Sequence, residues 1–182
     1  MSVRRQAILI VPLVICGLAA AFGLLGYFLG NALGMPNRFQ MPLMVRGCGV
    51  GVLGLGLFVM GWIRKYRRPM DILVSTYITM RKSIRRAPPQ EVGGRTEPLV
   101  LQGPQRYVRH PMYFAVVVLW LGWWLVLDYT FLLFLVIFFF LWFNLVVIWF
   151  EERELKALYR EEYEAYAKAV PRFFPSWKCR WP

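Results

Sequence analysis

The chain has 182 residues, of which 58% are hydrophobic and 17% aromatic, and its formal net charge is +12. Soluble domains are about 45–50% apolar, so this composition argues against a water-soluble fold and against disorder. The basic excess, 22 Lys and Arg against 10 Asp and Glu, could suggest nucleic acid. The charges are instead segregated from long apolar runs, which is typical of a membrane protein, and we expect no nucleic-acid partner.

Four apolar stretches are candidate membrane spans, since about 20 residues cross the hydrocarbon core. They comprise residues 7–29, 42–63, 112–127 and 130–150. A second apolar stretch follows the first within a dozen residues, so we interpret the first as a retained anchor and not as a cleaved signal peptide. Asp128-Tyr129 predicts a turn that joins the last two stretches into a helical hairpin. We therefore expect an all-α integral membrane bundle of about four transmembrane helices.

Basic residues predict how this bundle is oriented. If the spans alternate, twenty of the 22 Lys and Arg residues fall on the side of the N-terminus, and only Arg38 and Arg46 fall on the other side. Short cytoplasmic loops carry an excess of Lys and Arg. We therefore expect both termini to be cytoplasmic, together with the loop formed by residues 64–109.

Glycines in the first two spans predict close helix packing. They include Gly26, Gly30 and Gly34 at four-residue spacing, and six more in the second span: Gly47, Gly49, Gly51, Gly54, Gly56 and Gly61. Small residues let helix backbones approach closely in the membrane, where van der Waals packing must supply the attraction.

Two further helices are predicted on the cytoplasmic side. Residues 70–86 place apolar side chains at helical spacing and end in a basic cluster, which favours a helix lying at an anionic membrane surface as a tether. Beyond the last span, residues 155–166 repeat aromatic side chains at helical spacing among charged ones, and Val170-Pro171 ends that amphipathic helix. An aromatic tail that includes Trp177 and Trp181 would fold back on the bilayer. We divide the chain into an N-terminal transmembrane pair, residues 1–65, and a core, residues 66–182.

The densest group of chemically active residue types lies between Gly103 and Tyr113. Pro111 suits the first position of the third span, because the amide hydrogen that proline lacks would be unsatisfied there anyway. Arg109 and His110 would then lie at the cytoplasmic mouth of the bundle, where free amides of the helix start make an anion site. The alternative is that both side chains simply extend to the lipid headgroups.

A pair of acids follows the fourth span directly. Glu151 and Glu152 stand next to the hydrocarbon, where carboxylates are costly without a partner. Because the hairpin returns to the same face of the membrane, Glu152 should meet His110, although 42 residues separate them in the sequence. Arg109 and His110 are natural partners for the two acids. A purely structural ion pair is the alternative.

These segments together resemble the isoprenylcysteine carboxyl methyltransferase family and its wider group of phospholipid and thiol membrane methyltransferases. The resemblance covers roughly residues 97–176 and rests on Leu99-Val100, Gly103-Pro104, residues 106–113, Glu151-Glu152, Leu155, Tyr163, Tyr166 and residues 170–173. It implies an enzyme that transfers a methyl group from S-adenosylmethionine to a lipophilic or membrane-delivered acceptor, with a cytoplasmic active site and no metal.

The resemblance also implies roles for individual residues. Arg109 and His110 would be catalytic, with Arg109 meeting the carboxylate of the cofactor. The cofactor-binding residues would be Tyr107, His110, Pro111, Tyr113, Glu151 and Glu152, and the acceptor-binding residues would be Asn144 and Arg172.

This chain departs from the family pattern at two informative places. The family often has Gly where Arg160 stands, and members that act on a prenylcysteine carboxylate tend to carry Arg in the last turn before the acids. Residues 144–149 contain no Arg, so we expect a different acceptor, such as an amine, a phenol, a thiol or a lipid headgroup. The alternative functions are a nicotinamide-dependent sterol-type membrane reductase and a non-enzymatic membrane interaction subunit.

Overall fold

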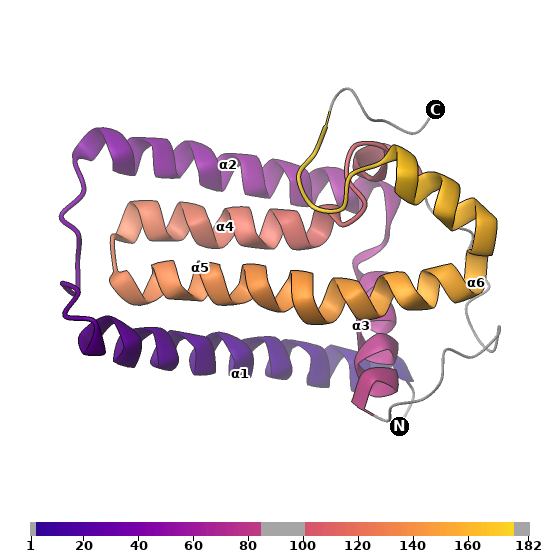
Figure 1. The fold of residues 1–182 in the computed structure, drawn as a ribbon, viewed down its shortest axis with the longest axis horizontal. Helices are drawn as coiled ribbons and strands as arrows, with labels where there is room; N and C mark the ends of the chain where they lie inside the picture. Colours follow the sequence, from indigo (N-terminus) through magenta and orange to yellow (C-terminus); the bar gives the residue numbers. More distant parts are fainter. Residues whose placement is uncertain (1–2, 85–100, 177–182) are drawn as a thin grey trace.

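The computed structural model describes residues 3–84 and 101–176, apart from the side chains of residues 79, 80 and 82–84. The expected all-α fold is confirmed (Figure 1). Its helices are α1 (Val3–Ala32), α2 (Leu43–Tyr66), α3 (Pro69–Ile84), α4 (Pro111–Leu127), α5 (Thr130–Trp142) and α6 (Ile148–Ala169). A short 3-10 helix, η1 (Gly103–Arg106), precedes α4, and a π-helical turn, η2 (Phe143–Val147), joins α5 to α6. Trp177 and Trp181 of the predicted aromatic tail, and the basic residues Arg85 and Arg86, lie outside the described residues.

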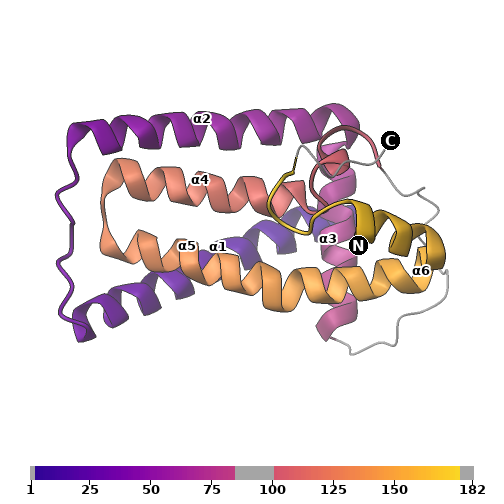
Figure 2. The same cartoon turned by 45° about the horizontal axis from the view of Figure 1, so that its top comes forward.

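The α4–α5 hairpin forms the centre of the bundle. α2 packs against α4 and α1 packs against α5, so the order across the bundle is α2, α4, α5, α1 (Figures 1 and 2). The first two helices are consecutive in the sequence but lie on opposite sides of the hairpin. We call the end that holds residues 33–42 and the Asp128-Tyr129 turn the hairpin end, and the opposite end, where α4 begins, the motif end.

Helix lengths fit a membrane-spanning bundle. α1, α2 and the continuous helical stretch Thr130–Ala169 are each long and apolar enough to cross a bilayer, whereas α4 is a shorter apolar helix. Its 17 residues span about 25 Å, less than the hydrocarbon thickness of about 30 Å. The start of α4 is therefore recessed between the longer α2 and α6 (Figure 1).

Close packing through glycine is confirmed along two seams. A Cβ atom at Gly56 of α2 would lie 2.8 Å from the Leu119 side chain of α4, and one at Gly26 of α1 would lie 2.6 Å from the Cβ of Phe134 in α5. Gly30, Gly49 and Gly122 make similarly close contacts. The packing prediction is wrong for five other glycines, which have no such neighbour within 4 Å because they lie off these seams: Gly34, Gly47, Gly51, Gly54 and Gly61.

The helix predicted over residues 70–86 is confirmed as α3, and it packs on the protein. It crosses the motif end of the bundle (Figure 2). Tyr77 is buried against Ala7 and Val11 of α1, and its hydroxyl donates a 3.0 Å hydrogen bond to the Gln6 side chain. α3 is thereby held next to the start of α4, and it forms part of the candidate site.

A sharp bend in α6 returns the chain toward the motif end. Arg160 has φ 42° and ψ −116°, and beyond it Tyr163 and Tyr166 are buried in a cluster with Val170 and Leu101. The Tyr166 hydroxyl donates a 2.7 Å hydrogen bond to the Gln105 carbonyl. Without the bend, this second half of α6 would extend away from the bundle.

Relieving the strain at the bend should stabilise the protein. A side chain in a sparsely populated backbone region costs about 1–3 kcal/mol, which glycine avoids. We expect Arg160→Gly to raise the free energy of unfolding by about 1 kcal/mol, net of the entropy that glycine loses on folding. Thermal unfolding in detergent measures the change. Arg160→Ala is the matched control, since it removes the same side chain but keeps the strain, and equal stability of the two variants would contradict the prediction.

Candidate functional site

The site is built on the first turn of α4. His110 is the N-cap of this helix and Pro111 is its first residue, as the sequence predicts. His110 is buried and Arg109 is mostly so, which excludes the alternative that both side chains extend freely to the headgroups.

The two acids reach the same place from α6. The π-helical turn η2 precedes them, and the Asn144 side chain donates a 2.9 Å hydrogen bond to the Phe140 carbonyl at this turn. An extra residue in one turn rotates the following helix face, and π turns are frequent at functional sites. Ile148 and Glu152 are consequently both buried in the bundle.

Glu152 lies at the centre of a cationic cluster. Its Oε1 is 2.8 Å from Nη1 of Arg109 and 3.3 Å from Nε2 of His110. Arg172 donates to both of its oxygens, from Nη2 at 2.5 Å and from Nε at 3.2 Å. A carboxylate held by a forked guanidinium is a strong, directional contact. Glu152 therefore joins three parts of the chain: the motif loop, α6 and the C-terminal tail.

The tail segment 170–176 lies along this loop. The Arg109 amide donates to the Pro171 carbonyl at 2.9 Å, and the Ser176 amide donates to the Tyr107 carbonyl at 3.2 Å. Phe173 is buried against Phe114 and Phe140, with ring centroids 6.1 and 5.2 Å apart. Backbone pairing and aromatic packing thus hold the tail over the start of α4.

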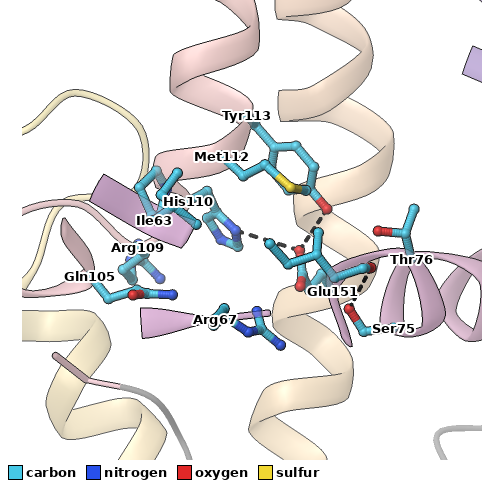
Figure 3. Close-up of a pocket in the computed structure, with 12 residues that line it drawn as sticks. Ile63, Arg67, Ser75, Thr76, Gln105, Arg109, His110, Met112, Tyr113 and Glu151 are labelled. Carbon is cyan, nitrogen blue, oxygen red and sulfur yellow. Dashed lines mark hydrogen bonds and ion pairs between the residues drawn. The ribbon is translucent and has the colours of Figure 1, made fainter. Parts of the chain in front are cut away.

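Glu151 faces a different direction, into a small cavity. The Tyr113 hydroxyl donates a 3.0 Å hydrogen bond to its Oε2, and Nδ1 of His110 lies 3.6 Å from the same oxygen (Figure 3). The cavity has a volume of about 60 Å³ and lies between the end of α2, the first half of α3, η1 and the starts of α4 and α6. Five residues singled out in the sequence line it: Arg109, His110, Pro111, Tyr113 and Glu151.

Several lining residues were not predicted from the sequence. They come mainly from α2 and α3: Ile63, Arg67, Ile72, Ser75, Thr76, Gln105 and Met112. In the sequence, Arg67 is one of several basic residues at 64–68, and this run indicates only which side of the membrane the loop lies on. Thr76 was part of the amphipathic pattern of residues 70–86, yet that pattern does not distinguish a membrane-facing side chain from one that faces a cavity.

Besides Glu152, whose contacts are described above, three predicted site residues do not line the cavity. Tyr107 packs its ring on Trp62 of α2, with centroids 5.9 Å apart. Asn144 is engaged with its own helix, and Arg172 binds Glu152. None of the three is among the residues that line the cavity.

Electrostatics favour a positively charged His110. Burial lowers the pKa of this imidazole, but hydrogen bonds to Glu151 and Glu152 and the charges of both acids outweigh burial, so the pKa is raised above its usual 6.5. Both ring nitrogens then act as donors, one toward each acid.

The raised pKa of His110 predicts how stability depends on pH. A group whose pKa is higher in the folded state contributes stability that is complete below pH 6.5 and is lost as pH rises through the folded pKa. We expect the melting temperature of the purified protein to fall as pH rises from 6.5 into the alkaline range. His110→Gln should flatten this part of the profile, and an unchanged pH dependence in that variant would contradict the assignment.

Comparison with known proteins places the chain in a family. The model of the phospholipid methyltransferase family (PEMT) matches residues 46–162. The chain belongs to this family. The match begins in α2 and includes α3, the motif loop, the hairpin and most of α6. No curated protein and no solved structure matched in the other two comparisons.

Membership confirms the resemblance to the membrane group of isoprenylcysteine and phospholipid methyltransferases. The protein is therefore a membrane methyltransferase, and both the cluster around Glu152 and the cavity beside Glu151 lie within or next to the matched region. Arg172 and the tail lie beyond it.

Proposed function

We propose that the protein transfers a methyl group from S-adenosylmethionine to a lipophilic acceptor delivered from the bilayer. The observation that carries this proposal is the meeting of the α4 start with the α6 acids at the edge of a cavity in the motif end. When bound, S-adenosylmethionine supplies an electrophilic methyl group, so the protein must align the acceptor with that group and exclude water. Alignment of two reactants can contribute about 7–11 kcal/mol.

The donor set fits this cofactor chemically. Carboxylates accept hydrogen bonds from ribose hydroxyls or an ammonium group, and an arginine binds a carboxylate. Ligand pockets generally measure about 300–1,000 Å³, so a cavity of about 60 Å³ accommodates only part of a nucleoside-sized ligand. We propose that α3 or the tail segment 170–176 shifts when the cofactor binds.

His110 is proposed to position the acids. With a carboxylate at each ring nitrogen, it holds Glu151 and Glu152 in place and has no free nitrogen for taking a proton from an acceptor. An acceptor that is already deprotonated, or a neutral amine, attacks the methyl group without such a base.

The acceptor is proposed to reach the site sideways from the membrane and to differ from a prenylcysteine carboxylate. Phe174 is exposed on the tail and Phe173 packs below it, so the roof of the site is aromatic and suits a lipid. Val147 stands in the last turn before the acids, so an acceptor carboxylate would lack a partner there, at a cost of several kcal/mol.

Binding of labelled S-adenosylmethionine to the detergent-purified chain tests the proposal. We expect saturable binding that unlabelled cofactor displaces. Binding of a nicotinamide cofactor in its place would indicate a reductase, and no binding of either would indicate an interaction subunit. A total lipid extract, soluble thiols and a farnesylcysteine analogue, offered with the labelled cofactor, then test the acceptor. Methylation of the farnesylcysteine carboxylate or of soluble thiols alone would refute the acceptor proposal.

Both termini and the site are proposed to be cytoplasmic, because twenty of the 22 basic residues belong to the motif end or its adjoining segments. Single cysteines at Asn37 and Lys168, in a background with the native cysteines replaced by serine, test the orientation. In sealed inverted vesicles a membrane-impermeant maleimide should label position 168 and leave position 37 unlabelled. Labelling of both positions from one side would overturn the topology.

A further inference from the structure

We infer that Arg67 and Glu151 form the subsite for the amino-acid portion of the cofactor, with Arg67 binding the carboxylate and Glu151 accepting from the ammonium group. This inference rests on the proposed use of S-adenosylmethionine and assigns a role to a residue outside the motif loop. It differs from the sequence-based expectation, in which Arg109 meets the carboxylate.

Arg109 also lines the cavity, but its charge is already balanced by the carboxylate of Glu152. Its Nη1 atom is 2.8 Å from Glu152, and both side chains are largely buried, 13% and 8% exposed. Taking Arg109 from Glu152 to bind a ligand would leave a buried carboxylate with one partner fewer, which is costly. The ion pair at Glu152 therefore makes Arg109 a poor choice as the carboxylate clamp.

Arg67 lies where α2 meets α3. It is the C-cap of α2, where its amide donates a 3.0 Å hydrogen bond to the Ile63 carbonyl, and the chain then turns into α3. Arg67 and Glu151 line the same cavity (Figure 3). One small cavity thus has a cation and an anion in its wall.

The rest of the wall suits a small zwitterion. Ser75 and Thr76 of α3 and Gln105 of η1 contribute hydroxyl and amide groups. The cavity volume of about 60 Å³ is far below the roughly 300–1,000 Å³ of typical ligand pockets, so the cavity suits only a small part of the cofactor. A planar guanidinium matches a carboxylate in a forked geometry, and a carboxylate accepts hydrogen bonds from an ammonium group.

Cofactor analogues test this subsite without any acceptor. The full-length purified chain is given labelled S-adenosylmethionine, which is displaced either by the unlabelled cofactor or by decarboxylated S-adenosylmethionine. The parent should bind the intact cofactor about ten- to a hundredfold more tightly than the analogue, the range for a hydrogen bond to a charged group. Arg67→Ala should reduce this ratio of affinities to near one. It should weaken the binding of the intact cofactor and leave the affinity for the analogue unchanged.

Arg64→Ala is the matched control. Arg64 lies on the same last turn of α2 and is exposed, so its loss changes the net charge equally but should preserve the ratio. An analogue without the α-amino group tests the role of Glu151. Glu151→Gln should abolish the preference for the intact cofactor over this analogue. That second measurement also decides the matter if Arg67→Ala does not fold.

The outcomes separate this inference from the proposed function. If the parent binds S-adenosylmethionine but does not distinguish it from either analogue, the subsite is refuted and the proposed cofactor stands. If Arg109→Ala removes the preference for the carboxylate and Arg67→Ala keeps it, Arg109 is the clamp and the inference is overturned. If the parent binds no S-adenosylmethionine, the proposed function itself fails.

Discussion

Glu152→Gln should release the tail from the motif loop and weaken the binding of S-adenosylmethionine by about 1.5–3 kcal/mol. The amide keeps the size of the side chain but loses the charge that Arg109 and Arg172 share. Arg109 would remain buried without its counterion, and breaking a buried pair costs about 3–5 kcal/mol. Because Arg172 is 43% exposed and is solvated when released, we expect the lower end of this range for the free energy of unfolding.

Hydrogen exchange and cofactor binding measure the two effects separately. The amides of Arg109, His110 and Ser176 should exchange faster in the variant, because they donate across the contact between the motif loop and the tail and depend on the position of the tail. Glu164→Gln is the control. Glu164 is exposed on α6, and its replacement by glutamine removes an equal charge. Parent-like exchange and cofactor affinity in Glu152→Gln would show that the cluster neither holds the tail nor supports the ligand.

The sequence predicts the contact between His110 and Glu152 because this contact depends on only a few local features of the chain. The apolar lengths of the hairpin helices and the turn at Asp128 return the chain to the face it left, which brings His110 within 3.3 Å of Glu152. Proline at the start of α4 and Val170-Pro171 after α6 likewise set helix ends locally.

Other parts of the site depend on packing that local patterns do not encode. The turn η2 inserts a π-helical step into an apolar run in which every residue is also compatible with an α-helix, so no residue type marks it. The bend at Arg160 places an arginine in a conformation that favours glycine. Arg67 faces a cavity only because α3 folds across the bundle, which is a tertiary event far from the motif.

At the hairpin end too, the structure gives two residues contacts that the sequence did not predict. Arg38 and Arg46 are the two basic residues that the charge pattern assigns to this side, and both turn out to serve the hairpin turn. Arg46 donates a 3.2 Å hydrogen bond to Asp128, and the guanidinium of Arg38 lies 4.1 Å above the ring of Tyr129. The Met41 amide also donates to Asp128, at 2.9 Å, so the segment between α1 and α2 is fastened to the tip of the central hairpin.

Asp128→Ala should therefore be strongly destabilising although it lies far from the motif end. The Asp128 side chain is fully buried, and its backbone is left-handed with φ 67°. Alanine removes two hydrogen bonds, leaves Arg46 without its counterion and is unfavourable in that conformation, so we expect a loss of about 3–5 kcal/mol in the free energy of unfolding. Asp128→Asn tolerates the left-handed backbone and keeps an acceptor for the Met41 amide, so its loss should be smaller, about 1–3 kcal/mol.

A double-mutant cycle decides whether the ion pair causes this loss. Arg46→Ala should destabilise the parent but add little in the Asp128→Ala background, because the two side chains form one interaction and their effects are not additive. Thermal unfolding in detergent gives the four free energies, and the coupling should be about 1 kcal/mol or more, since Arg46 is 40% exposed and partly screened by water. Additive losses would mean that Asp128 acts through its backbone conformation and the Met41 amide alone. In every variant that still folds, S-adenosylmethionine should bind as tightly as it does to the parent, because the fastened turn and the proposed cofactor site occupy opposite ends of the bundle.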